Sequence, residues 1–338
     1  SDALVVGDLN RAINVSTRDG DDPALFYRVV NATTNAVLNT NIISLPSDAL
    51  NCDVSLAFDK VNNQCYAVVV YNQVSTNGIT LEYYRFDSSS DDLDNSPCTS
   101  DYVVTSDLVA NTINIDTDDN GNFLVVADLY IGAVTNQRTG LVLIPGTIYE
   151  GTATGCIDPG YSPGVNEECI TYIRPPSEED DLAWPDVSLS ENYWYGGPIF
   201  VDNVSAVITY QVGASPAHHI EVIVAPEFPC FDYLKENQLE SLAELATTTG
   251  YYADEPYYRY FQFNDSHFSG SDMLHPRISS LVGTDVTWQV VCESQESGRS
   301  DIYMFDEDIS DPADYDFVHV TEPTGSGLIS ETDILNFN

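Results

Sequence analysis

The chain has 338 residues, of which 43% are hydrophobic, and it carries a net charge of −42 from 53 acidic and 11 basic residues. The apolar fraction supports a real core, whereas the charge excludes nucleic acid as a natural partner because its phosphates would be repelled. No run of about eighteen apolar residues exists, so no segment is predicted to span a membrane. The acidic excess suits a salty or cation-rich milieu, or serves as a solubilising surface.

Five segments share one design, an alternating strand followed by a polar loop and a second alternating strand, at residues 12–30, 67–86, 123–144, 205–225 and 285–305. A shorter strand is predicted before each segment, at residues 4–11, 54–64, 113–122, 187–197 and 277–285. An outer strand is predicted after each segment, at residues 36–44, 101–107, 169–173, 259–263 and 317–321. Period-2 alternation with frequent turn residues is typical of antiparallel strands.

The repeat predicts an all-β protein, because four-stranded sheets repeated radially bury their faces against one another as a β-propeller of about five blades. A Greek-key sandwich would not repeat one unit along the chain in this way. We therefore expect a single propeller domain over residues 1–338. The tail at residues 327–338 is too short for a complete sixth blade, and it either begins one, closes the ring on the first sheet or adds a strand to a neighbouring molecule.

Two insertions are expected to enlarge the later units, at residues 145–182 and 226–262. The second contains a predicted helix over residues 231–250, which Gly250 ends. Its apolar stripe is expected to pack on its own domain, and it consists of Leu234, Leu239, Leu242 and Leu245.

Two stretches resemble known propeller repeats. "HPRISSLVGTDVTWQVVCESQESGRSDIYMFD" (residues 275–306) resembles a TolB-type blade, in which a Pro-x-Ile-Ser entry leads to a Trp-bearing strand and then Asp-Ile-Tyr. "INIDTDDNGNFLVVAD" (residues 113–128) is similar to the Asp-x-x-Gly-Asn blade turn of NHL and related bacterial repeats. The resemblance covers single blades, implies architecture and carries no catalytic residue.

The seven cysteines contain no Cys-x-x-Cys motif, which leaves zinc ribbons and thioredoxin-like sites unsupported. Cys52 and Cys65 are thirteen residues apart, as are Cys156 and Cys169, and such spacing suits local disulfides in an oxidising compartment. At least one of the others, Cys98 among them, must be free or bonded to another chain. The predicted disulfide-forming residues are Cys52, Cys65, Cys156, Cys169, Cys230 and Cys292.

Asn-x-Ser/Thr sequons point to the same compartment, and they begin at Asn14, Asn31, Asn203 and Asn264. Together with the cysteines they favour an extracellular or cell-surface glycoprotein. The alternative is an intracellular protein of a halophile, whose cysteines would be reduced and whose sequons would be empty.

The stretch "DTDDNGN" at residues 116–122 reads at first as a calcium loop. An EF-hand would need a bidentate Glu at its twelfth position, where Ala127 stands, and helices on both sides. Alternating strands flank the stretch instead, so we interpret it as an Asn-Gly hairpin turn. A loop calcium site formed by Asp116, Asp118 and Asn120 remains a candidate.

No catalytic motif accompanies the five histidines, and no nucleophile elbow, Walker loop or Rossmann fingerprint occurs, so no catalytic residue is predicted. Asp53, Asp116 and Asp186 are nevertheless predicted on innermost strands, which line a propeller's axial channel. Five-bladed glycoside hydrolases place carboxylates there, and "AWPDVSL" (residues 183–189) loosely resembles one such family.

Two functional hypotheses follow. The preferred one is a non-enzymatic secreted or cell-surface glycoprotein with a structural, adhesive or filament-forming role, whose partners are itself, other extracellular proteins or glycans. The alternative is an extracellular propeller that binds or hydrolyses carbohydrate through axial carboxylates. No organic cofactor is predicted, and Ca²⁺ is the one candidate ion.

Overall fold

The computed structural model describes the strands and the short turns between them. The described residues are 2–6, 9–20, 22–59, 64–73, 75, 78–94, 98–102, 110–118, 122–131, 138–147, 171–173, 181–192, 203–213, 218–225, 259–263, 272–281, 287–296, 299–308 and 316–320. No α-helix lies within these ranges. The predicted helix at residues 231–250 and the tail at residues 327–338 fall outside them.

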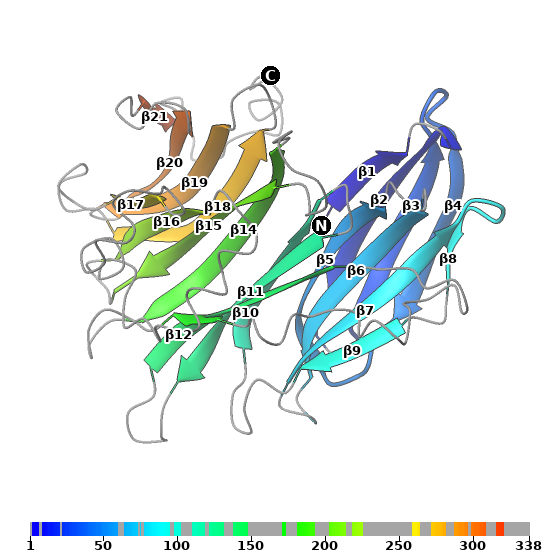
Figure 1. Cartoon of the computed structure of the whole chain (residues 1–338), viewed down its shortest axis with the longest axis horizontal. Coiled ribbons are helices and arrows are strands. Elements are labelled where there is room, and N and C mark those ends of the chain that lie inside the picture. Colours follow the sequence, from blue (N-terminus) through cyan, green and yellow to red (C-terminus); the bar gives the residue numbers. More distant parts are fainter. Residues whose placement is uncertain are drawn as a thin grey trace.

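The described residues form five antiparallel sheets in chain order (Figure 1). The first contains β1 (Asp2–Val6), β2 (Arg11–Arg18), β3 (Ala24–Asn31) and β4 (Val37–Ser44). The second contains β5 (Ala49–Asp59), β6 (Gln64–Gln73), β7 (Gly78–Asp87), the short β8 (Asp92–Leu93) and β9 (Cys98–Tyr102). The third contains β10 (Ala110–Thr117), β11 (Asn122–Ile131), β12 (Arg138–Thr147) and β13 (Thr171–Ile173).

The last two sheets repeat this pattern. The fourth contains β14 (Leu182–Asn192), β15 (Asn203–Val212), β16 (His219–Ala225) and β17 (Arg259–Phe263). The fifth contains β18 (Asp272–Leu281), β19 (Thr287–Glu296), β20 (Arg299–Asp308) and β21 (Asp316–Val320). In these sheets, strands that follow one another in the sequence lie side by side, except that β8 and β9 of the second sheet both pair with β7. The all-β prediction and the repeated four-strand unit are therefore confirmed.

The boundaries of the first strands differ from the predicted ones. The segment expected at residues 54–64 is β5, which starts at Ala49, and the one expected at 277–285 is β18, which starts at Asp272. Both strands contain a register shift, between Leu50 and Asp53 and between Leu274 and Arg277. A β-bulge breaks the two-residue alternation of apolar and polar residues. The alternation that predicts a strand is therefore visible only in the residues that follow the bulge.

The core lies between stacked sheets, and β6 shows how one strand serves two of its layers. Every residue from Cys65 to Asn72 is buried. Cys65, Ala67, Val69 and Tyr71 belong to the cluster shared with the first sheet, whereas Tyr66, Val68 and Val70 belong to the cluster shared with the third. Successive side chains of a strand point to opposite faces, so the second sheet is covered on both faces.

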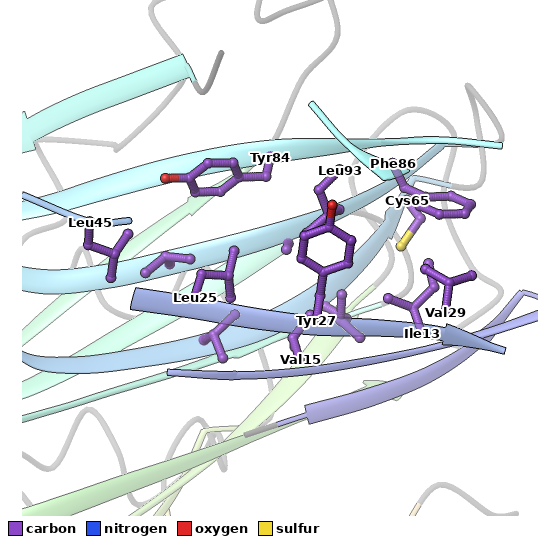
Figure 2. Close-up of a cluster of buried hydrophobic side chains, with 14 of the residues drawn as sticks. Ile13, Val15, Leu25, Tyr27, Val29, Leu45, Cys65, Tyr84, Phe86 and Leu93 are labelled. Carbon is purple, nitrogen blue, oxygen red and sulfur yellow. The ribbon is translucent and has the colours of Figure 1, made fainter. Parts of the chain in front are cut away.

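Figure 2 shows the cluster between the first and second sheets. Tyr27 of β3 lies among aliphatic side chains from its own sheet and across from Tyr84 and Phe86 of β7. Each large apolar side chain buried in this way contributes about 1.5–3 kcal/mol to folding. The stacking continues along the chain through contacts of β5 with β10, β10 with β14 and β14 with β18.

Candidate functional site

The first strands of the later sheets carry one repeated segment. Asp53-Val54-Ser55-Leu56 of β5 has the same sequence as residues 186–189 of β14. Residues 114–117 of β10 and 277–280 of β18 occupy the corresponding places, with Asn114 and Arg277 in the first position. A register shift precedes each of the four segments. A β-bulge changes the direction of the side chains that follow it. Because a bulge precedes each segment, the side chains of all four segments point in equivalent directions.

These segments surround a polar cavity of about 580 Å³ together with Asp2 of β1. Its lining therefore comes from the first strand of every sheet. The polar residues in it are Asp2, Asp53, Ser55, Asn114, Asp116, Asp186, Ser188, Arg277 and Ser279. Asp53, Asp116 and Asp186, which were predicted on innermost strands, all line this one cavity from the first strands of their sheets.

Each carboxylate of the cavity accepts a hydrogen bond from a backbone N–H of the next sheet. The four bonds run from Leu56 to Asp2 (2.8 Å), from Ile115 to Asp53 (3.1 Å), from Leu189 to Asp116 (2.7 Å) and from Ile278 to Asp186 (2.9 Å). We refer to these four as the aspartate–backbone bonds. Hydrogen bonds to an ionised acceptor are stronger than neutral ones and compensate a buried carboxylate for lost hydration. The cavity aspartates thus join consecutive sheets.

A second set of contacts links the carboxylates through hydroxyl groups. Ser55 Oγ lies 3.2 Å from Asp2 Oδ2, 3.4 Å from Asp116 Oδ1 and 2.9 Å from Thr117 Oγ1. Thr117 Oγ1 in turn donates to the carbonyl of Leu56 at 2.9 Å. The first three sheets therefore share one hydrogen-bond network at the cavity.

Arg277 supplies the positive charge of the cavity lining. Its Nη1 lies 3.8 Å from Asp186 Oδ1 and 3.5 Å from Asn114 Oδ1, and its side chain is 54% exposed. The Asn114 amide also donates to the carbonyl of Pro185 in β14. Arg277 thus links the third, fourth and fifth sheets at the cavity through Asn114 and Asp186.

Burial dominates the acid–base behaviour of these carboxyl groups. It raises the pKa of Asp116 to about 7, and the charges of Asp2 and Asp186 add to the increase while the Leu189 hydrogen bond opposes it. Burial likewise raises the pKa of Asp186 to about 6, against the Ile278 hydrogen bond and the Arg277 charge. It also raises the pKa of Asp53. Near neutral pH the cavity therefore contains carboxyl groups able to give or take a proton.

Sequence reasoning did not identify Asp2, Asn114 or Arg277 as cavity residues. Alignment of the repeated segments would have found the last two, since both occupy the position of Asp53. Asp2 stands at the start of β1 outside any repeated motif, and its place in the cavity lining, with hydrogen bonds from Leu56 and Ser55, is visible only in the structure.

The hairpin predicted around residues 116–122 is present, because β10 pairs with β11 from Thr117 opposite Phe123. Asp116 lines the cavity and Asp118 is buried, while Asn120 lies outside the described residues. Within the described ranges, no group of three or more His, Cys, Asp or Glu side chains is placed to hold a metal ion. The calcium site thus stays a prediction.

The predicted Cys52–Cys65 disulfide is wrong, because both residues are free thiols. Cys65 stands opposite Phe58, so Cys52 lies six positions further along β5, about 20 Å away at about 3.4 Å per residue. A disulfide needs Cα atoms within about 7 Å. Cys292 is also a free thiol, and the other predicted disulfide cysteines (Cys156, Cys169 and Cys230) lie outside the described residues.

The sequons lie in different settings. Asn14 is exposed on β2, and Asn31 ends β3, where its Oδ1 accepts hydrogen bonds from the backbone of Thr33 and Thr34. Asn203 begins β15, and Asn264 lies outside the described residues.

Of the histidines, His275 lies two residues before Arg277, whereas His219 contacts Glu221 at 3.2 Å on β16.

Comparison with models of known protein families and with curated proteins finds no match to this chain. In the part of the chain that the structure describes, no helix is both long and apolar enough to cross a membrane.

Proposed function

We propose that the five sheets are the blades of one β-propeller and that the protein is a non-enzymatic extracellular glycoprotein with a structural, adhesive or filament-forming role. The blade arrangement is supported by the stacking of consecutive sheets and by the cavity that the first strands of all five share. The exposed Asn14 supports glycosylation. The resemblance of residues 275–306 to a TolB-type blade agrees with this architecture.

The aspartate–backbone bonds carry the preference for a scaffold role. Asp2, Asp53, Asp116 and Asp186 each place an oxygen on the backbone of the next sheet. A carboxylate that accepts such a hydrogen bond links two sheets whether or not a substrate is present. The acidic residues of the cavity are thereby explained without catalysis.

Native material tests the extracellular assignment and the assembly role directly. Intact-mass measurement before and after deglycosylation should show a loss of glycan mass, and negative-stain microscopy should show oligomers or filaments. An unglycosylated, purely monomeric species would contradict the proposal. Small-angle scattering of the monomer should match a single compact disc-shaped particle if the sheets form one propeller.

A second candidate function is carbohydrate binding or hydrolysis at the same cavity. The observation that favours it is the pair Asp116 and Asp186, whose pKa values are raised to about 7 and about 6 beside a cavity of about 580 Å³. Glycoside hydrolysis needs one carboxylic acid and one carboxylate near neutral pH.

Release of reducing sugar from polysaccharides decides between the two candidates. Activity of the wild-type chain that is lost in Asp53→Asn, Asp116→Asn or Asp186→Asn, and kept in Asp22→Asn, would establish the second candidate. Asp22 is the matched control because it is exposed in the turn between β2 and β3. We expect no release from any of these proteins.

A further inference from the structure

Two bulky residues in the bulges that precede cavity-lining segments adopt a backbone conformation that bulky residues rarely adopt. Trp184 has a φ of 52° and His275 a φ of 51°. Each lies in the bulge of a first strand, in β14 and in β18, and each is followed by a proline. A left-handed backbone at a bulky side chain costs free energy, and such strain collects at binding sites. Nothing in the scaffold role described above requires an aromatic residue at either position.

The two rings form an edge-to-face pair on the surface. Their centroids lie 4.6 Å apart and their planes are inclined by 76°. Trp184 is 40% exposed, so its indole is available to solvent although it is the kind of side chain that folding normally buries. The His275 ring is oriented by Glu293, whose Oε2 lies 3.3 Å from His275 Nδ1. The indole is therefore held in place while its surface stays open.

The pair lies close in sequence to polar residues of the cavity lining, which itself contains neither ring. Trp184 precedes Asp186 by two residues, and His275 precedes Arg277 by two. Arg277 contacts both Asp186 and Asn114, which brings carboxylate, guanidinium and amide groups together at this side of the cavity. Ligand sites commonly combine an aromatic surface with a few convergent polar groups.

We propose that Trp184 and His275 form the binding platform for a pyranose sugar ring, with Asp186, Asn114 and Arg277 hydrogen-bonding its hydroxyl groups. The apolar C–H face of a pyranose matches the indole, and its hydroxyls match planar polar side chains. The four cavity aspartates outnumber Arg277, so a neutral sugar is favoured over a negatively charged uronate. The proposal shares the sugar-binding premise of the second candidate function but requires no hydrolysis.

Sugar binding is measured with the full chain by calorimetry and by tryptophan fluorescence, using the methyl glycosides of glucose, galactose, mannose and N-acetylglucosamine, with glucuronate as the charged probe. We expect at least one neutral glycoside to bind, and glucuronate to bind about tenfold more weakly or not at all. Trp184→Gly should weaken binding by at least about tenfold, since it removes the platform. Glycine accepts the left-handed backbone, so this variant should fold.

The control variant is Ile42→Ala, which alters another exposed apolar side chain, on β4, and should bind as the wild type does. Binding that survives Trp184→Gly, binding of glucuronate alone, or the absence of binding by every probe would each overturn the proposal. Sugar binding without release of reducing sugar would support the platform and reject hydrolysis. The experiments therefore distinguish a failure of the binding platform from a failure of the hydrolase candidate.

Discussion

At the residue scale, the carboxyl group of Asp116 shows how burial and hydrogen bonding oppose one another. Burial favours the neutral form, and the N–H of Leu189 at 2.7 Å favours the charged form. Burial is the larger effect, because the pKa rises to about 7. A carboxyl group with a raised pKa stabilises the folded state at low pH, and this contribution is lost as the pH rises through the folded-state pKa.

Replacing Asp116 by Asn should therefore remove part of the pH dependence of stability. The amide keeps an acceptor for Leu189 but carries no charge, so Asp116→Asn should be more stable than the wild type at pH of about 8, by on the order of 2 kcal/mol. Urea unfolding between pH of about 4 and about 8 measures this. Asp22→Asn is the control, and wild-type and Asp116→Asn profiles that run parallel would contradict the assignment.

Trp184 is a residue whose removal should cost little stability. Loss of a buried Trp typically costs about 3–5 kcal/mol, but Trp184 is partly exposed and its left-handed backbone suits glycine. We expect the free energy of unfolding of Trp184→Gly to lie within about 1 kcal/mol of the wild type. Urea denaturation checks this value, and a loss above about 3 kcal/mol would show that the indole acts in packing.

At the scale of elements, the first strands are joined both by apolar packing and by the aspartate–backbone bonds. Asp53 of β5 illustrates the second contribution, since it receives the N–H of Ile115 in β10 at 3.1 Å. Removing the acceptor leaves that N–H without compensation at a buried position, which is more costly than the loss of an average hydrogen bond.

Asp53→Ala should accordingly destabilise the protein by about 1–3 kcal/mol, whereas Asp53→Asn, which retains an acceptor oxygen, should cost less than about 1 kcal/mol. Hydrogen exchange at the Ile115 amide should become faster in the Ala variant and stay close to wild type in the Asn variant. Equal exchange rates in all three proteins would show that the bond does not protect this strand pair.

The pairing register of β5 with β6 decides the state of two cysteines. Cys65 faces the cluster of apolar residues between the first two sheets (Figure 2), where burial raises the pKa of its thiol to about 12. The thiolate is the reactive form of cysteine. Cys65 should resist iodoacetamide in the folded protein and react once guanidinium unfolds it. Peptide mapping without reductant measures this, and a Cys52–Cys65 cross-linked peptide would contradict the register.

At the scale of the whole molecule, the charge of −42 dominates. Like charges spread over a folded chain repel one another, and dissolved salt screens that repulsion over about 10 Å at 0.1 M. The raised pKa values of Asp116 and Asp186 mean that the cavity adds to this repulsion mainly above pH of about 6.

Added salt should therefore stabilise the protein more at pH of about 8 than at pH of about 5. We expect the Tm to rise by about 3 °C or more between low salt and about 0.5 M NaCl at the higher pH, and by less at the lower one. Differential scanning calorimetry measures both transitions. A Tm that falls with added NaCl at either pH would show that favourable ion pairs outweigh the repulsion.

The strands and their grouping in fours were predictable from the sequence because they depend on local information. The apolar run along β11 and the turn residues between β10 and β11 are visible in adjacent residues, and the β10–β11 hairpin closes over a short distance. The proximity of Asp53, Asp116 and Asp186 followed from this repeat, since equivalent positions in equivalent strands face the same way.

What only the tertiary structure decided depends on register and on contacts between sheets. The spacing of Cys52 and Cys65 suited a disulfide, but pairing of Phe58 with Cys65 separates the two thiols, because spacing in a hairpin does not determine which residues stand opposite each other. Asp2 and Arg277 reach the cavity from the first and last sheets, far apart in the chain. The left-handed backbone of Trp184 arises from a bulge, which alternation alone does not reveal.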